Sequence, residues 1–116
     1  MEKRKILMIT SYPPRECGIA TFSRDLVSAI HKSFGTSLEI EVCALENGCN
    51  LGRDYPSEVN YIINAAEMDS FFSVADKLNE RSDIGMVCIQ HEFGLYGGEY
   101  GSHLVAFLLR LNIPAC

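Results

Sequence analysis

Short apolar runs alternate with longer amphipathic segments along this chain of 116 residues. Short apolar runs bounded by turn residues are typical of buried strands, and an apolar period of three to four residues is typical of helices. The pattern predicts strands over Lys5–Ser11, Leu38–Leu45, Glu58–Ile63 and Ile84–Gln90, and helices between Gly18 and Gly35, over Met68–Leu78 and over Leu104–Leu111. Such an order favours an α/β fold with a doubly wound parallel sheet. Right-handed crossovers make 3-2-1-4 the expected strand order.

The same pattern predicts which faces are buried. The first helix is expected to bury a stripe of residues four apart: Phe22, Leu26, Ile30 and Phe34. The Leu38–Leu45 strand carries Glu39, Glu41 and Cys43 between its apolar residues, so it is expected to be less buried. The Ile84–Gln90 strand is apolar on both faces, which predicts a central place in the sheet.

The segment from Asn112 to Cys116 has the character of the start of a fifth strand. We expect a single domain over residues 1–116 that is truncated where this strand would continue. An open sheet edge beside the apolar Leu104–Leu111 helix predicts that the fragment self-associates.

Charge, apolar runs and cysteine content argue against nucleic-acid-binding, membrane-spanning and secreted proteins. The net charge of −5 argues against a nucleic-acid partner, which needs clustered Lys and Arg. No apolar stretch approaches the ~18 residues of a membrane span, and two prolines interrupt the run after Ile9, so no secretory signal is expected. Five cysteines without a C-x-x-C pair predict reduced thiols, no structural metal and a cytoplasmic protein.

Two loops stand out chemically. Ligands of parallel sheets bind at the carboxyl ends of the strands, where the strand order reverses, here between strands 1 and 4. This rule selects Tyr12–Ala20 and His91–Gly101. Gly18 precedes a helix whose free amides attract phosphate, although it could equally relieve the backbone after two prolines. No phosphate-binding loop of the G-x-x-x-x-G-K-[ST] type and no G-x-G-x-x-G dinucleotide fingerprint is present there.

In the second loop His91 and Glu92 are followed by four glycines within eight residues. A histidine shares or moves a proton near neutral pH, and glycines allow amides to turn toward a ligand. The alternative is that His91 merely ends a strand through a hydrogen bond. His31 and His103 are expected to be solvated helix residues.

At this point the chain resembles a known family. YPPRECGIATFSRDL at 12–26 and IQHEFGLYGGEYG at 89–101 resemble the amino-terminal region of family 4 glycosyltransferases. These enzymes have the GT-B fold, in which two Rossmann-like domains face each other across a cleft. The resemblance spans essentially the whole chain, and it implies the amino-terminal, acceptor-side domain of a retaining, metal-independent hexosyltransferase.

The resemblance also implies roles for individual residues. His91 matches the active-site histidine near the donor sugar, and Cys17, Gly18 and Ile19 lie in the loop that faces the donor diphosphate. The family's usual Gly-Gly is Cys17-Gly18 here, which puts the backbone contact at Cys17 in doubt. The acceptor and donor-sugar loop is Glu92, Gly97, Gly98 and Glu99.

The implied substrates are a nucleotide-diphosphate sugar, with mannose or glucose as candidate sugars, and a carbohydrate or lipid-linked acceptor. No cofactor is implied. The remaining donor contacts belong to a carboxyl-terminal domain that this chain lacks, so the fragment alone is expected to be inactive. The full-length enzyme is expected to contact membranes peripherally.

Two other classes remain open. Glu46 follows the second strand, where an acidic residue holds the ribose in NAD-type dinucleotide-binding domains. A non-catalytic, flavodoxin-like interaction module is the second alternative. It would carry a phospho-acceptor Asp after the first strand, where Thr10 and Ser11 stand instead.

Overall fold

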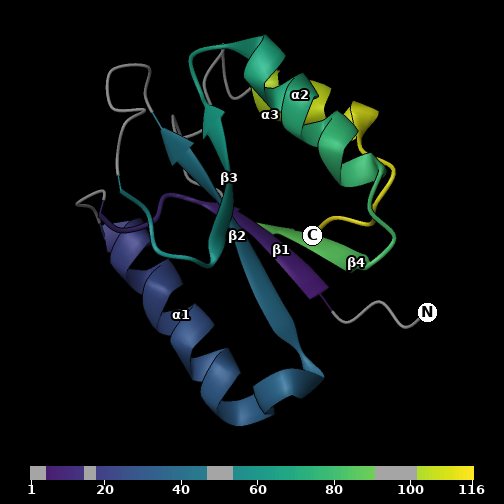
Figure 1. Cartoon of the computed structure of the whole chain (residues 1–116). Coiled ribbons are helices and arrows are strands. Elements are labelled where there is room, and N and C mark those ends of the chain that lie inside the picture. The colour runs from purple at the N-terminus through teal and green to yellow at the C-terminus, as the bar shows by residue number, and fades with distance from the viewer. Residues whose placement is uncertain (1–4, 15–17, 47–53, 91–101) are drawn as a thin grey trace.

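The computed structural model describes residues 5–14, 18–46, 54–90 and 102–116 (Figure 1). A sheet of four parallel strands runs through this part of the chain in the order β3-β2-β1-β4, which confirms the expected order. The strands are β1 (Lys5–Thr10), β2 (Glu39–Glu46), β3 (Val59–Asn64) and β4 (Ile84–Ile89). The helices are α1 (Gly18–Phe34), α2 (Met68–Asn79) and α3 (Ser102–Arg110), with a short 3-10 turn at Gly35–Ser37.

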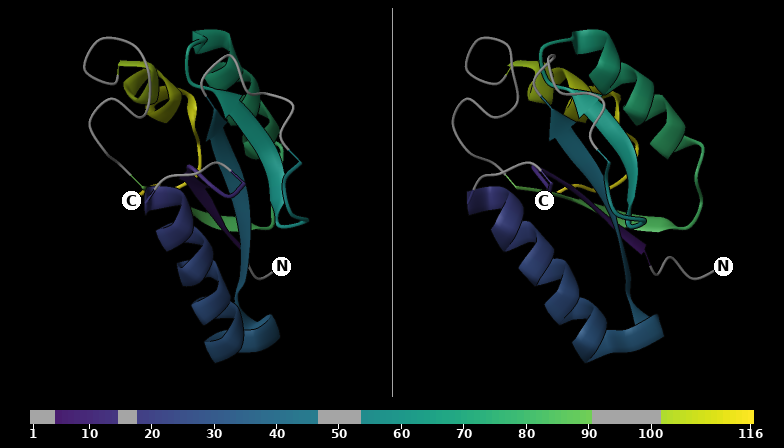
Figure 2. Two further views of the ribbon diagram at one scale, coloured as in Figure 1. Left: turned by 90° about the vertical axis from the view of Figure 1, so that its left-hand side faces the viewer. Right: turned by 60° about the vertical axis from the view of Figure 1, so that its left-hand side comes forward.

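The helices cover both faces of the sheet, which makes the fold doubly wound and Rossmann-like. Figures 1 and 2 show α1 on one face and α2 with α3 on the other. Along β1, Leu7 and Ile9 belong to the core under α2 and α3, while Met8 belongs to the core under α1. This alternation follows from the two-residue period of a strand, and it explains why β1 is apolar on both faces.

The buried face of α1 matches the expected one only in part. Ala20, Ser23 and Val27 are the buried residues of α1. Of the expected stripe, Leu26 and Ile30 are half-buried against the core, whereas Phe22 and Phe34 are 57% and 54% exposed. The two small residues let the helix lie close to the sheet, and the Ser23 and Thr10 hydroxyl oxygens are 2.7 Å apart. Gly35 ends α1 as expected, with a φ of 57° that favours glycine.

The burial of β2 corrects the sequence prediction, whereas the place of β4 agrees with it. β2 lies between β1 and β3 and is buried from Ile40 to Glu46, although its alternating polar residues predicted exposure. β4 is the edge strand of the four-stranded sheet, but it lies between β1 and a further paired segment, which agrees with its expected central place. Its outer side pairs, within the described residues, with the segment Pro114–Cys116 through an isolated bridge between Val87 and Ala115. This bridge confirms the expected start of a fifth strand.

Ion pairing explains how β2 buries a carboxylate. Glu41 is 8% exposed and accepts hydrogen bonds from both terminal nitrogens of Arg81, at 2.7 and 2.8 Å. Lys5 lies 3.2 Å from Glu41 and 3.3 Å from Asp83. Asn60 donates to the same carboxylate at 2.7 Å. This cluster, which we call the amino-edge network, joins the beginnings of all four strands on the edge opposite the predicted ligand site.

Acid should weaken the fold through this network. The Arg81 guanidinium lowers the pKa of Glu41 to about 2, from 4.5 for the ordinary group, and the pKa of Asp83 is lowered to about 2 by the same side chain. Because both pKa values are depressed, their stabilisation is complete above about pH 4.5 and is lost as the pH falls toward 2. For Glu41 we expect a loss on the order of 2–3 kcal/mol in the free energy of unfolding.

Urea unfolding of the wild type and of Glu41→Gln at pH 7, 4 and 2.5 measures the contribution of the ionised Glu41 to the free energy of unfolding. The stability difference between the two proteins should shrink steadily as the pH falls. A difference that stays constant over this range would show that the Glu41 pKa is not depressed by folding.

The outer face of α3 is apolar, as its sequence predicts. Val105, Leu108 and Leu109 are exposed, Leu109 to 84%, while Leu104 and Phe107 are buried. The self-association expected from this face stays a prediction. Within the described residues, no helix combines the length and apolar character needed to cross a membrane.

Candidate functional site

The two unusual loops leave the sheet from neighbouring strand ends. Ile9 near the end of β1 is the register partner of Ile89 at the end of β4, and the Gln90 amide donates to the Ile9 carbonyl at 3.0 Å. From β1 the chain leads into α1 on one face, and after β4 it returns in α3 on the other (Figure 2). The gap between two strands whose connections leave in opposite directions is where parallel sheets bind ligands.

Hydroxyl groups are buried at the end of β1. Thr10 Oγ1 donates to the Ser11 carbonyl at 3.0 Å, so the Ser23 hydroxyl is the donor in its 2.7 Å contact with Thr10. The Ser11 hydroxyl is fully buried and finds no hydrogen-bond partner in the part of the chain that the structure describes. A buried polar group without a partner has free hydrogen-bonding capacity for a water molecule or a ligand.

Gly18 and Ile19 are the first two residues of α1. Gly18 is exposed, and a Cβ added there would meet no atom of the described residues within 4 Å. Its φ is outside the left-handed region, which Gly35 alone among the described glycines adopts. Packing and backbone conformation therefore do not require glycine at position 18. The interpretation that it relieves the backbone after two prolines finds no support here.

The other predicted site residues fall outside the described part of the chain. These are Cys17 in the predicted diphosphate loop, and His91, Glu92, Gly97, Gly98 and Glu99 in the second loop. The positions from which both loops depart are described, and they are adjacent. The roles of these six residues stay predictions.

A pocket of about 450 Å³ lies beside the first turns of α1, and sequence reasoning did not find it. Its lining comes from three separate segments: Pro13, Pro14, Arg24, Asp54, Tyr55 and Pro56. The proline and tyrosine rings give it flat apolar walls, while Arg24 and Asp54 supply charged hydrogen-bonding groups. Such a mixture suits a ring-shaped ligand that carries hydroxyl groups.

Two tyrosine hydroxyls fix the walls of this pocket. Tyr55 donates to Glu46 Oε2 at 2.6 Å, and Tyr12 donates to Glu58 Oε2 at 2.6 Å. Tyr12 is fully buried, and burial together with the nearby Glu58 carboxylate raises its pKa. Tyr12 therefore stays protonated and holds the chain before β3 against the loop after β1.

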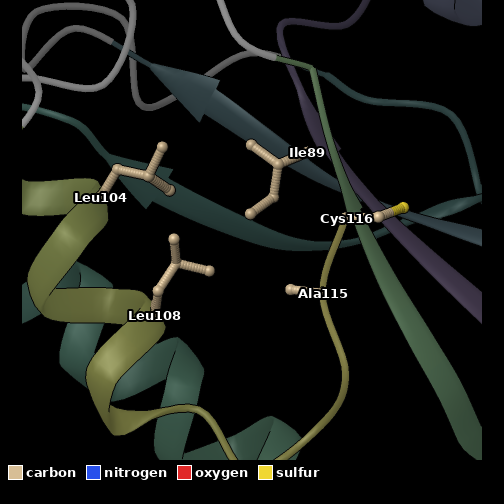
Figure 3. A pocket seen from close by; sticks show the side chains of 5 residues that line it. All are labelled: Ile89, Leu104, Leu108, Ala115 and Cys116. Atoms are coloured by element: carbon tan, nitrogen blue, oxygen red, sulfur yellow. The ribbon is translucent and has the colours of Figure 1, made fainter.

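A second pocket, of about 210 Å³, is apolar and lies between α3 and the outer edge of the sheet. Ile89, Leu104, Leu108, Ala115 and Cys116 line it. Figure 3 shows the Ile89, Leu104 and Leu108 side chains converging on it, while the Cys116 sulfur points away. Because the Cys116 sulfur points out of this pocket and the other lining side chains are apolar, the pocket offers no group for chemistry.

His103 is not the solvated residue that the sequence predicted. It is half-buried in the first turn of α3, with Nδ1 3.1 Å from the Ala65 carbonyl oxygen and its ring edge-on to Phe71 at 5.7 Å. A carbonyl oxygen only accepts hydrogen bonds, so Nδ1 carries the hydrogen. In the sequence, the apolar Leu104 and Phe107 on the same helix were the only signal for this packing.

Glu46, the residue that favoured a dinucleotide site, is buried. Its carboxylate accepts the Tyr55 hydroxyl, so it is a structural acceptor behind the larger pocket and is not presented to a ribose. The strand order 3-2-1-4 also differs from the 2-1-3-4-5 order of flavodoxin-like domains. The buried Glu46 therefore no longer favours a dinucleotide site, and the strand order disfavours the flavodoxin-like module.

No protein-family model matches this chain, and neither a curated protein nor a solved structure matches it. The arrangement of its own residues is therefore the basis for assigning a function.

Proposed function

We propose that this chain is the acceptor-side domain of a retaining, metal-independent GT-B glycosyltransferase. The observation that supports this function most is the neighbouring position of the two loops, because Ile9 and Ile89 are register partners. The two sequence stretches that resemble family 4 glycosyltransferases start from these two strand ends. A transfer reaction needs donor and acceptor groups to meet at one place, and this edge of the sheet supplies it.

The start of α1 suits the donor diphosphate. When a nucleoside diphosphate leaves, negative charge grows on its phosphate oxygens, and preorganised amides at a helix start stabilise that charge. Gly18 is exposed at this point and lacks a side chain, so the backbone can approach phosphate closely. The Ser11 hydroxyl, which has no hydrogen-bond partner among the described residues, lies at the neighbouring end of β1 and adds a buried polar group to the same edge.

The larger pocket suits the acceptor. Proline and tyrosine rings pack against the flat face of a sugar ring, and Arg24 and Asp54 can bond its hydroxyl groups. The Tyr55 ring is held by its hydrogen bond to the buried Glu46, so little side-chain freedom is lost on binding. A carbohydrate or a lipid-linked saccharide is the class of acceptor that fits, with mannose or glucose as candidate donor sugars.

The rest of the proposal follows from the family resemblance. A second, nucleotide-sugar-binding domain would close over this edge and supply the remaining diphosphate contacts. The complete enzyme would act in the cytoplasm, with peripheral membrane contact where the acceptor is lipid-linked.

Gly18→Ala tests the donor assignment. Because a Cβ at position 18 meets no atom of the described part of the chain within 4 Å, the thermal midpoint should be unchanged. If diphosphate approaches this backbone, the added methyl group should raise the donor KM of the complete enzyme about tenfold. Initial rates with UDP-glucose and GDP-mannose, measured as nucleoside diphosphate release, give this KM.

Gly35→Ala is the matched control. Its φ of 57° strains an alanine, so stability should fall by about 1–2 kcal/mol while donor KM stays constant. Unchanged donor KM in Gly18→Ala would remove the start of α1 from the donor site. Failure of the complete enzyme to bind or turn over any sugar nucleotide would overturn the proposed function.

A further inference from the structure

Three sulfur atoms gather at the outer edge of the sheet. Cys88 Sγ lies 3.3 Å from Cys116 Sγ, and Cys116 Sγ lies 3.5 Å from Met86 Sδ. We call Met86, Cys88 and Cys116 the sulfur cluster. Both cysteines are free thiols, and nothing in the proposed transfer reaction uses them.

Backbone pairing places these three residues together. Val87 and Ala115 are bridge partners in parallel strands, so Cys88 and Cys116, one residue further along each strand, lie opposite each other. The Ile89 amide donates to the Cys116 carbonyl, and the Cys116 amide donates to the Val87 carbonyl, both at 2.9 Å. The register of β4 with the chain after Pro114 therefore fixes the cluster.

In the described part of the chain, the cluster reaches the surface. Val87 belongs to the core under α2 and α3, so Met86 and Cys88 face the opposite side of the sheet. Figure 3 shows the Cys116 sulfur pointing away from α3. On that side α1 packs against β1 and β2, while Cys116 is exposed and Met86 and Cys88 are half-buried.

We propose that Met86, Cys88 and Cys116 form a binding site for a soft monovalent metal ion of the Cu⁺ class. Two thiolates and a thioether are the ligands that such ions prefer over oxygen or imidazole groups. On binding, each thiol loses its proton to solvent and forms a sulfur–metal bond, and the Met86 sulfur donates a lone pair. No electron is transferred, so the metal enters and remains in the same oxidation state.

The sulfur spacing suits a metal better than a disulfide. At a metal–sulfur bond of about 2.3 Å, three sulfurs in a plane around the ion lie about 4 Å apart. The observed separations of 3.3 and 3.5 Å reach that value by small side-chain rotations. A disulfide needs an S–S distance of about 2.05 Å, which is further from the observed 3.3 Å than the metal spacing is.

Zinc is disfavoured at this place. Structural zinc takes four ligands from cysteine, histidine and carboxylate groups. Among the described residues no three His, Cys, Asp or Glu side chains come together in a way that could hold a metal. The third ligand at the sulfur cluster is a methionine, which selects for the softer ion.

Anaerobic titration of the reduced chain with Cu⁺, against the chelator bathocuproine disulfonate, tests the site. We expect one Cu⁺ per chain to be retained, with a thiolate-to-copper absorption band in the ultraviolet. Cys88→Ser and Cys116→Ser should each weaken binding by about 100-fold or more, and Met86→Leu by about tenfold. Circular dichroism of each variant establishes that it is folded.

Cys49→Ser is the matched control and should bind one Cu⁺ as tightly as the wild type. The proposal is overturned if Cu⁺ uptake persists unchanged in Cys88→Ser or Cys116→Ser, or is lost in Cys49→Ser. Tighter retention of Zn²⁺ than of Cu⁺ would overturn it too. So would a disulfide between Cys88 and Cys116, mapped by mass spectrometry of peptides after exposure to air, in a chain that takes up no Cu⁺ when reduced.

Discussion

In the proposed glycosyltransferase, His91→Ala should lower kcat by about 10²–10³ while donor affinity changes little. His91 lies outside the described residues, but Gln90 before it is bonded to the end of β1, at the proposed transfer site. A histidine there can hydrogen-bond the sugar as the leaving group departs. Such a contact is worth most in the transition state, so its loss affects kcat more than binding. Steady-state kinetics with a saturating acceptor measures both quantities.

Thermal unfolding of the same variant separates catalysis from scaffolding. If His91 only ends a strand through a hydrogen bond, His91→Ala should melt early and keep a near-normal kcat per folded molecule. That result would remove His91 from the catalytic site. His31→Ala is the control, since His31 is exposed on α1 and should change neither kcat nor the melting temperature.

Strand order and loop placement could be predicted because few alternatives exist for them. Right-handed crossovers restrict the sheet to 3-2-1-4, and the switch-point rule then selects the loops after β1 and β4. Gly35 was a reliable helix stop because its φ of 57° is costly for any residue with a Cβ. In each case a local or topological constraint allows only one structure.

The buried face of a helix was harder to predict, because two neighbouring stripes of residues fit the same helical period. In α1 the stripe through Ala20, Ser23 and Val27 lies beside the one through Phe22, and only the distance between helix and sheet decides between them. β2 looked exposed because of Glu41, whose partner Arg81 lies 40 residues away in sequence. Pairing between residues so far apart does not show in the periodic pattern of the sequence.

The larger pocket and the sulfur cluster could not be predicted from the sequence either, because each is formed by residues that are distant along the chain. Arg24 and Tyr55 line one pocket although they come from α1 and the segment before β3. Cys88 and Cys116 meet because β4 pairs with the chain after Pro114. Each residue type was visible in the sequence, but its neighbours exist only in the folded chain.

Replacing Arg81 with methionine should lower the free energy of unfolding by about 3–5 kcal/mol, because it leaves Glu41 buried without its main partner. Arg81 donates to Glu41, to Asp83 at 2.7 and 2.9 Å and to the Tyr61 hydroxyl at 3.2 Å. Lys5 remains 3.2 Å from Glu41, so the loss should lie toward the lower end of that range. Urea unfolding with a constant m-value measures it.

The double variant Glu41→Leu/Arg81→Met distinguishes a buried ion pair from general packing. Once both charges are gone, no carboxylate stays buried without a partner, and Lys5 keeps Asp83 at 3.3 Å. The double variant should therefore regain most of the stability that Arg81→Met loses. Arg110→Met is the matched control. Arg110 Nε lies 2.7 Å from Asp76, but the two side chains are 48% and 53% exposed, so its loss should cost less than about 1 kcal/mol. If Arg81→Met costs no more than Arg110→Met, the amino-edge network behaves as a surface ion pair, and burial of Glu41 does not depend on it.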